Sequence, residues 1–106
     1  MSAVLIRHGQ TASIVLAYTV NGESLVDYAP DELEFMFGGV QYLLSDGGIV
    51  WSDDENAFVV ELDQTATFAL PATAQYQLRV LKDGVVGVSD IESMRIGAAI
   101  SREVLS

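Results

Sequence analysis

The sequence contains no cysteine, so neither disulfide bonds nor thiolate-bound metals are possible. Basic residues are scarce, with 5 Lys and Arg against 15 Asp and Glu and a formal net charge of -10. This charge opposes binding to nucleic-acid phosphates and to anionic membranes. No apolar run is long enough to span a bilayer. Arg7, His8 and Gln10 also interrupt the apolar stretch that a signal peptide would need. We therefore expect a cytoplasmic protein whose partners are neither nucleic acid nor membrane.

Apolar residues, by contrast, are abundant. They make up 50% of the chain, whereas charged residues make up 19%. The length of 106 residues predicts a single domain over residues 1–106. So short a chain cannot bury all of this apolar surface within itself, which indicates a subunit interface and a homo-oligomer.

The apolar residues recur with a period of two through most of the chain, which predicts strands. The clearest alternation sets Leu33, Phe35 and Phe37 against Glu32 and Glu34. Because successive side chains of a strand point to opposite faces, the apolar set should face a core and the acidic pair solvent. Further runs of this kind cover residues 3–7, 13–20, 40–44, 49–51, 57–62, 74–82, 85–88 and 94–100.

Turn signals separate these runs. Asn21-Gly22 and Asp83-Gly84 are the dipeptides that two-residue hairpin turns favour, because both positions need a positive φ. Residues 45–48 form a short connection that contains Asp-Gly and lies between two apolar runs. This pattern predicts a hairpin that pairs residues 40–44 with 49–51.

The stretch from Asp63 to Leu70 does not follow the strand pattern. Asp63 can cap a single helical turn, which Pro71 would prevent from continuing. The remaining elements predict an all-β fold, specifically an antiparallel β-sandwich of immunoglobulin-like size with seven or eight short strands. A small barrel is the alternative architecture.

The only histidine lies in the string Leu5-Ile6-Arg7-His8-Gly9-Gln10-Thr11. This string resembles the opening motif of the histidine phosphatase family. The resemblance implies His8 as the phosphorylated nucleophile and Arg7 as the phosphate clamp. The family also uses a second histidine and a longer α/β fold, and the sequence offers neither. We interpret the match as coincidental and keep a divergent phosphatase as a remote alternative.

A second resemblance covers most of the chain. It lies in the runs Phe58-Val59-Val60-Glu61-Leu62-Asp63-Gln64-Thr65, Leu70-Pro71, Tyr76-Gln77-Leu78-Arg79-Val80 and Lys82-Asp83-Gly84. These runs resemble small β-sandwich domains of bacteriophage and prophage virion proteins, including domains of tail and baseplate proteins. One departure is the segment 72–74, where that group often carries a glycine before the tyrosine. The resemblance implies an assembly subunit that contacts itself or other virion proteins, first in the host cytoplasm and then in the virion.

Candidate binding residues surround the 45–56 region. Trp51, Tyr42 and Phe58 could form an aromatic contact surface for a sugar or a protein. The acidic loop with Asp53 and Asp54 could supply oxygen ligands to Ca²⁺, but it lacks the spacing of an EF-hand loop, and we interpret it as a solvated turn. We therefore predict binding residues Trp51, Tyr42, Asp53 and Asp54, with no metal and no cofactor.

The predicted function is that of a non-enzymatic structural or assembly subunit of a phage or prophage tail, neck or baseplate, without catalytic residues. The alternative is a monomeric module that binds a carbohydrate or a peptide through the Trp51 region. Self-association discriminates between the two, because a binding module can remain monomeric.

Overall fold

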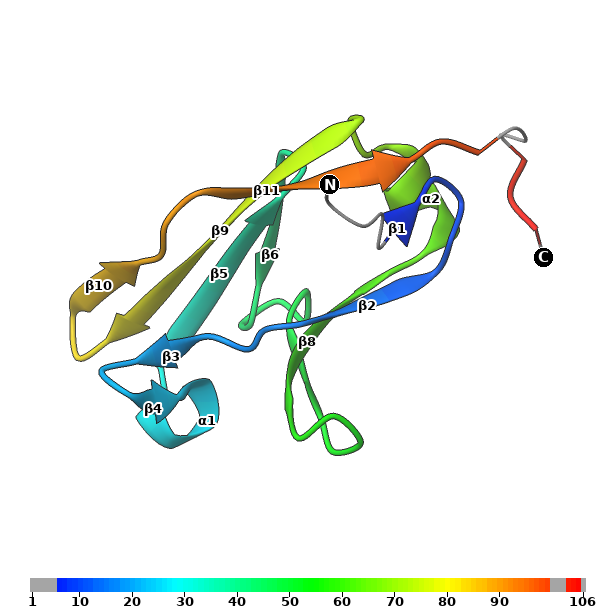
Figure 1. Ribbon diagram of the computed structural model, residues 1–106. Helices are drawn as coiled ribbons and strands as arrows, with labels where there is room; N and C mark the ends of the chain where they lie inside the picture. Colours follow the sequence, from blue (N-terminus) through cyan, green and yellow to red (C-terminus); the bar gives the residue numbers. More distant parts are fainter. Residues whose placement is uncertain (1–5, 100–102, 106) are drawn as a thin grey trace.

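The computed structural model describes residues 6–99 and 103–105 and shows an architecture dominated by strands (Figure 1). The expected all-β class is confirmed. The predicted strand parts 3–5 and 100 lie outside the described residues. Within the described part of the chain, no helix combines the length and the apolar character needed to cross a membrane.

The large sheet has six strands: β1 (Ile6–Arg7), β5 (Glu32–Phe37), β6 (Val40–Leu43), β9 (Thr73–Lys82), β10 (Val85–Val88) and β11 (Glu92–Gly97). The longest strand, β9, is its centre. β5 pairs with one edge of β9, and β6 pairs with the far edge of β5. β10 and β11 share the other edge of β9, one after the other. β1 adds to β11 in parallel, so this sheet is mixed.

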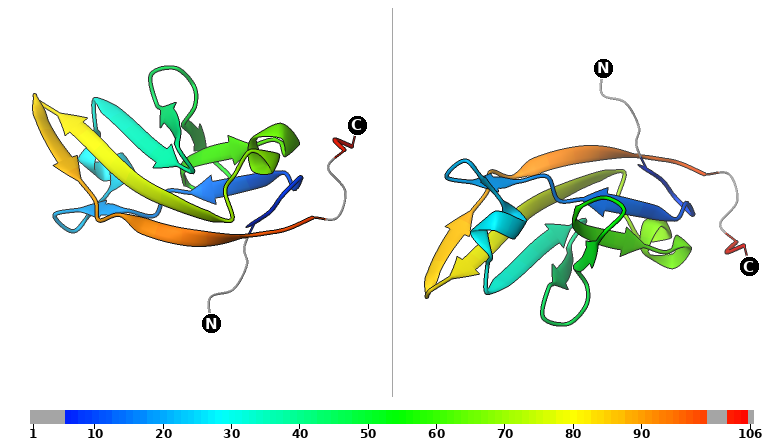
Figure 2. Two further views of the ribbon diagram at one scale, coloured as in Figure 1. Left: turned by 90° about the horizontal axis from the view of Figure 1, so that it is seen from above. Right: turned by 90° about the horizontal axis from the view of Figure 1, so that it is seen from below.

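A small antiparallel sheet has three strands: β2 (Ala12–Val15), β7 (Val50–Ser52) and β8 (Ala57–Leu62). A separate hairpin consists of β3 (Thr19–Val20) and β4 (Glu23–Ser24). The described residues thus contain eleven strands instead of seven or eight. The predicted run 13–20 divides into β2 and β3, and β4 is too short for its pattern to be recognised. Figure 2 shows the large sheet curling toward the small one.

The core lies between the two sheets. On β5, Leu33, Phe35 and Phe37 are at most 2% exposed, which confirms the apolar face predicted from the alternation. Residues of the small sheet join the same cluster, including Val60 and Leu62 of β8. Burying a side chain of this size contributes about 1.5–3 kcal/mol relative to leaving it in water, so this cluster holds the two sheets together.

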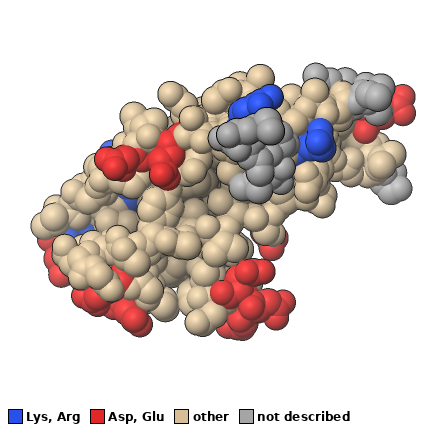
Figure 3. Space-filling view, in the orientation of Figure 1, with Lys and Arg blue, Asp and Glu red and all other residues tan. Residues whose placement is uncertain are grey.

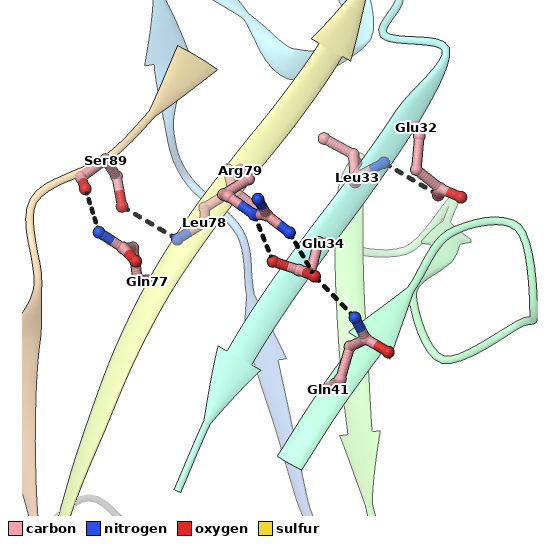
Figure 4. A network of polar contacts seen from close by, with 8 residues as sticks. All are labelled: Glu32, Leu33, Glu34, Gln41, Gln77, Leu78, Arg79 and Ser89. Carbon is pink, nitrogen blue, oxygen red and sulfur yellow. Dashed lines mark hydrogen bonds and ion pairs between the residues drawn. The ribbon is translucent and has the colours of Figure 1, made fainter. Parts of the chain in front are cut away.

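The opposite face of β5 differs from the expectation at Glu34. This residue lies on the outer face, but it is only 9% exposed because neighbouring side chains cover it. Arg79 donates from Nε to Oε1 at 2.6 Å and from Nη2 to Oε2 at 2.9 Å, and Gln41 donates to Oε2 at 2.7 Å (Figure 4). These hydrogen bonds, those from Arg79 first, hold the pKa of the Glu34 carboxyl below its usual value.

Two predicted hairpin turns are confirmed. Asn21-Gly22 joins β3 to β4 and Asp83-Gly84 joins β9 to β10, each with positive φ at both positions. The predicted pairing of residues 40–44 with 49–51 is reduced to one backbone hydrogen bond, from the Ile49 N–H to the Leu43 carbonyl at 3.0 Å, and the predicted ladder of strands is wrong. β6 already pairs with β5 through the turn at Gly38-Gly39, so the chain instead crosses from β6 to the small sheet. Ile49, which is buried in the core, anchors this crossover.

The helical turn predicted after Asp63 is also confirmed. The helix α2 (Gln64–Phe68) begins where the Asp63 carboxylate accepts the Ala66 N–H at 2.8 Å. The other helix, α1 (Leu25–Tyr28), is capped by Ser24, whose hydroxyl accepts the Asp27 N–H. α2 also carries Gln64, whose side chain exchanges two hydrogen bonds with the backbone of Leu105.

A β-bulge separates β10 from β11. Leu78 of β9 lies opposite Ser89, and Tyr76 lies opposite Glu92, so two residues, Asp90 and Ile91, face Gln77 alone. Side chains stabilise this irregularity (Figure 4). The Ser89 hydroxyl accepts the Leu78 N–H at 2.9 Å, and the Gln77 amide donates to the Ser89 carbonyl at 2.9 Å. The bulge therefore has a defined position, as bulges at sheet edges usually do.

Candidate functional site

The most prominent concave feature is a groove of about 900 Å³ between the segment 11–19 and β11. Among the described residues the two sheets are not paired across it, because β2 ends the small sheet and β11 pairs only with β9 and β1. In Figure 1, β2 runs below β11 without joining it. Apolar side chains from both sheets line the groove: Ile14, Leu16, Phe35, Phe37, Tyr76 and Met94. The groove thus lies along the side of the core where the two sheets are not joined.

The walls of this groove are strand edges whose outward backbone groups pair with no other strand in the described part of the chain. Leu16 donates its N–H to Phe58 at 2.9 Å, and pairing alternates along an antiparallel ladder. Ser13 and Val15 therefore direct their N–H and C=O groups away from β8. On the other wall, Ile96 donates to the carbonyl of Ala72, so Ser93 directs its groups away from β9. Edges of this kind can add a strand from a partner.

Tyr18 spans the groove at one end. It lines both the groove and a smaller cavity of about 250 Å³, and Ser89 does the same from the opposite wall. Burial raises the pKa of the Tyr18 phenol, and the Glu92 carboxylate and Tyr76 raise it further. A hydrogen bond with the Ser89 side chain acts in the opposite direction. At the other end, β1 pairs with β11 and closes the groove.

The rim of the groove near Tyr18 is acidic. Asp90 and Glu92 both line it: Asp90 lies in the bulge before β11, and Glu92 is the first residue of β11. Burial raises the pKa of Tyr76, and the neighbouring Glu92 carboxylate raises it further. Figure 3 shows an area of acidic side chains over this part of the large sheet. The groove therefore combines an apolar floor with a negative rim.

The edge of β10 is a second exposed apolar feature. Val85, Val86 and Val88 are 67%, 54% and 57% exposed, and Ile91 in the bulge that follows is 65% exposed. β10 carries no charged residue and pairs only with β9 among the described strands. Because Ser89 is hydrogen-bonded to Leu78, Val86 and Val88 direct their backbone groups away from β9. The uncharged run Val85-Val86-Gly87-Val88 was the sequence signal for this edge.

The predicted aromatic surface is brought together only in part. Trp51 is 38% exposed and contacts Phe58 edge-on, with ring centroids 5.2 Å apart. Its indole Nε1 donates to Asp53 at 2.9 Å. A cavity of about 320 Å³ adjoins this pair. Trp51, Phe58 and Asp53 are therefore one cluster.

Tyr42 and Asp54 do not belong to this cluster. Tyr42 lies on β6 and lines a different hollow with Asp63, whose carboxylate adds to the effect of burial and raises the Tyr42 pKa. Asp54 is exposed in a turn that is closed by hydrogen bonds from Asn56 to Asp53 and from Glu55 to Ser52. Residues 6–99 and 103–105 contain no group of three or more His, Asp or Glu side chains placed to hold a metal ion.

His8 lies in the turn between β1 and β2. Its Nε2 and the Leu70 carbonyl are hydrogen-bonded at 2.8 Å, and its Nδ1 is buried. The next residue, Gly9, has a φ of 82°, and an added Cβ would lie 2.6 Å from the Phe68 ring. These contacts tie the turn to the segment around α2, which favours a structural role for His8.

Comparisons with known proteins add no relative. No family model matches the chain, and neither a curated protein nor a solved structure matches it.

Proposed function

We propose that the protein is a non-enzymatic assembly subunit that acts through protein–protein contacts, in the manner of the phage and prophage virion domains that its sequence resembles. We interpret the two sheets as the layers of an incomplete sandwich. The observation that carries the proposal is the edge of β10, where a strand of exposed valines has backbone groups that no other described strand pairs with. Soluble proteins usually blunt such an edge with charge, proline or a covering segment.

Copies of the chain meet through this edge in our proposal. The net charge of -10 opposes contact between copies over most of the surface. β10 is free of charge, so two β10 strands can pair without bringing like charges directly opposite each other. An antiparallel pair of this kind is self-complementary, as a two-fold interface requires.

Solution mass tests the proposal. We expect light scattering on a sizing column to show a mass that rises with concentration toward a dimer or a larger closed assembly. In Val86→Lys, a charge placed on the free edge should leave a monomer at the same concentrations. Val26→Lys is the matched control, because it adds the same charge at an exposed valine of α1. A wild type that stays monomeric throughout contradicts self-assembly, and equal effects of the two variants contradict the role of β10.

The Trp51 cluster supports a second candidate function, a binding module for a carbohydrate or a peptide. Trp51 is the only tryptophan and lies beside the cavity of about 320 Å³. Its fluorescence should change on titration with a soluble oligosaccharide that binds there, and Trp51→Phe should abolish the response. A monomeric chain with a saturable fluorescence change would favour this module over the assembly subunit.

A further inference from the structure

We infer that the groove between β2 and β11 binds one extended segment of a partner protein, apolar at alternate positions and carrying a Lys or Arg opposite Glu92. The inference rests on the proposed function, since it names the partner chemistry of a subunit that acts through protein contacts. It concerns a different surface from the β10 edge.

The backbone groups of the two walls require an extended occupant. Ser13 and Val15 present N–H and C=O groups on one wall, and Ser93 presents them on the other. A strand satisfies such groups along its whole length, whereas a helix keeps its backbone bonds within itself. The bound segment therefore pairs as an additional strand, the mode known as β-augmentation.

The ends of the groove set the length of that strand. β1 occupies the edge of β11 at one end, and Tyr18 crosses toward Ser89 at the other. Between these two stops, β2 and its continuation offer residues 12–17. This span accommodates a strand of about six residues, close to the usual strand length.

The floor and the rim determine the side chains of the segment. The partly exposed side chains of Ile14, Tyr76 and Met94 form an apolar floor over the buried Phe35 and Phe37, so the residues that point inward are apolar. Residues that point outward alternate with them and reach the rim, where Asp90 and Glu92 lie. A cationic side chain there forms a charge-assisted hydrogen bond with a carboxylate.

Charge also excludes a second copy of this chain as the occupant. The chain has only 5 Lys and Arg among 106 residues, and a copy would bring a net charge of -10 to an acidic rim. A basic partner segment gains from the same field, which also speeds its association at low salt. The occupant is therefore a different protein.

Selection from a displayed library of random seven-residue peptides tests this inference on the full chain. We expect enriched peptides with apolar residues at alternate positions and at least one Lys or Arg between them. The enriched peptides, made synthetically with a fluorophore, should bind in fluorescence anisotropy measurements with an affinity that falls as salt rises.

Two variants place the peptide in the groove. Glu92→Gln should weaken binding about tenfold by removing one charged hydrogen bond, whereas Asp54→Asn, which removes a charge from the exposed 52–56 turn, should not. Val15→Pro removes an N–H that points away from β8, so it should abolish pairing with the peptide. The fold should be kept, because proline at this edge position breaks no hydrogen bond with β8. Val15→Thr keeps that N–H and should bind as the wild type does. Thermal unfolding of each variant separates loss of binding from loss of fold.

The outcomes are distinct from those of the self-association test. A selection without enrichment overturns the inference, and so do enriched peptides that bind Glu92→Gln and Val15→Pro as tightly as the wild type. Peptides that fail to bind only to Val86→Lys place the site at β10 and also overturn it. In each case the proposed assembly through β10 is judged by solution mass alone.

Discussion

β5 and β10 pair with the two opposite edges of the same strand, β9, yet they meet very different surroundings. β5 alternates apolar and acidic residues, and β6 covers its other edge. Its apolar set is almost completely buried, as Leu33 shows with 0% exposure. β10 has valines at three of its four positions, no strand on its far side among the described residues, and 67% exposure at Val85.

The difference shows that residues with a preference for strands can build a buried strand, as in β5, or an exposed edge strand, as in β10. Alternation in β5 matches a sheet with one face in the core and one toward water. Within one chain, the apolar face of β5 is buried and both of its edges are paired. Three valines among the four residues of β10, without a charged residue, match a strand that is covered on both faces. Among the described residues no strand covers the far edge of β10, and this is the edge that the proposed self-association uses.

The largest effect is expected from truncating the two strands in the same way. Leu33→Ala should lower the free energy of unfolding by about 2–5 kcal/mol, because it leaves a cavity in the core. Val85→Ala should change it by less than about 0.5 kcal/mol in dilute solution, because this valine is already in water. Urea unfolding of both variants measures these changes. Similar losses of unfolding free energy in the two variants would contradict the contrast between β5 and β10.

A smaller effect is expected at the bulge that ends β10. Ser89→Ala removes the hydroxyl that accepts the Leu78 N–H and leaves that donor without its partner, at a cost of about 1–3 kcal/mol. Ser93→Ala on the exposed edge of β11 is the matched control and should be nearly neutral. Equal stabilities of the two variants in urea would show that the bulge does not depend on the Ser89 side chain.

The outer face of β5 should respond to pH more weakly. The folded-state pKa of Glu34 lies below its unfolded value, chiefly because of the hydrogen bonds from Arg79. Its stabilising contribution is therefore present above the unfolded pKa and is lost as pH falls through the folded pKa. Glu34→Gln should be slightly less stable than the wild type at neutral pH, by less than the loss in Ser89→Ala, because Arg79 is half exposed.

Parallel acid titrations of stability check this sign. The difference between the wild type and Glu34→Gln should shrink as the pH falls below the usual range for a glutamate. A difference that stays constant between neutral and acidic pH would mean that the carboxylate charge contributes nothing to the stability of β5.

The smallest effect on stability is expected at the centre of β10. Val86→Lys should alter the unfolding free energy of the monomer by less than about 0.5 kcal/mol, since its side chain and backbone groups face water. Its effect on solution mass should nevertheless be complete. A large loss of monomer stability would instead mean that β10 belongs to the core, which would remove the contrast with β5.

Local chemistry made part of the fold predictable. The turns Asn21-Gly22 and Asp83-Gly84 need only their own φ preferences, and the Asp63 cap needs only the next three residues. The alternation in β5 reports burial directly. The pairing of residues 40–44 with 49–51 was mispredicted because the same short apolar runs fit a hairpin or a crossover between sheets, and only the rest of the core decides which.

The candidate site was less predictable because it depends on long-range placement. Trp51 and Asp53 lie two positions apart, so their contact follows from local geometry. The separation of Tyr42 from them depends on the crossover after β6. Tyr18 and Glu92 are distant in sequence, and no local pattern indicates that they face one groove. The parallel pairing of β1 with β11, which closes that groove, could not be predicted either, because β1 has only two residues and shows no sequence pattern.

The bulge opposite Gln77 limits how far any added strand can extend. β10 offers four residues, and β11 pairs with β9 over another four, from Glu92 to Arg95. A bulge bends and twists the strand that carries it, so the two lengths do not form one straight template. Segments that stack into fibrils are about six or seven residues long and flat. We therefore expect concentrated solutions to yield closed assemblies of defined size, without the slow growth of fibres that so apolar an edge would otherwise seed.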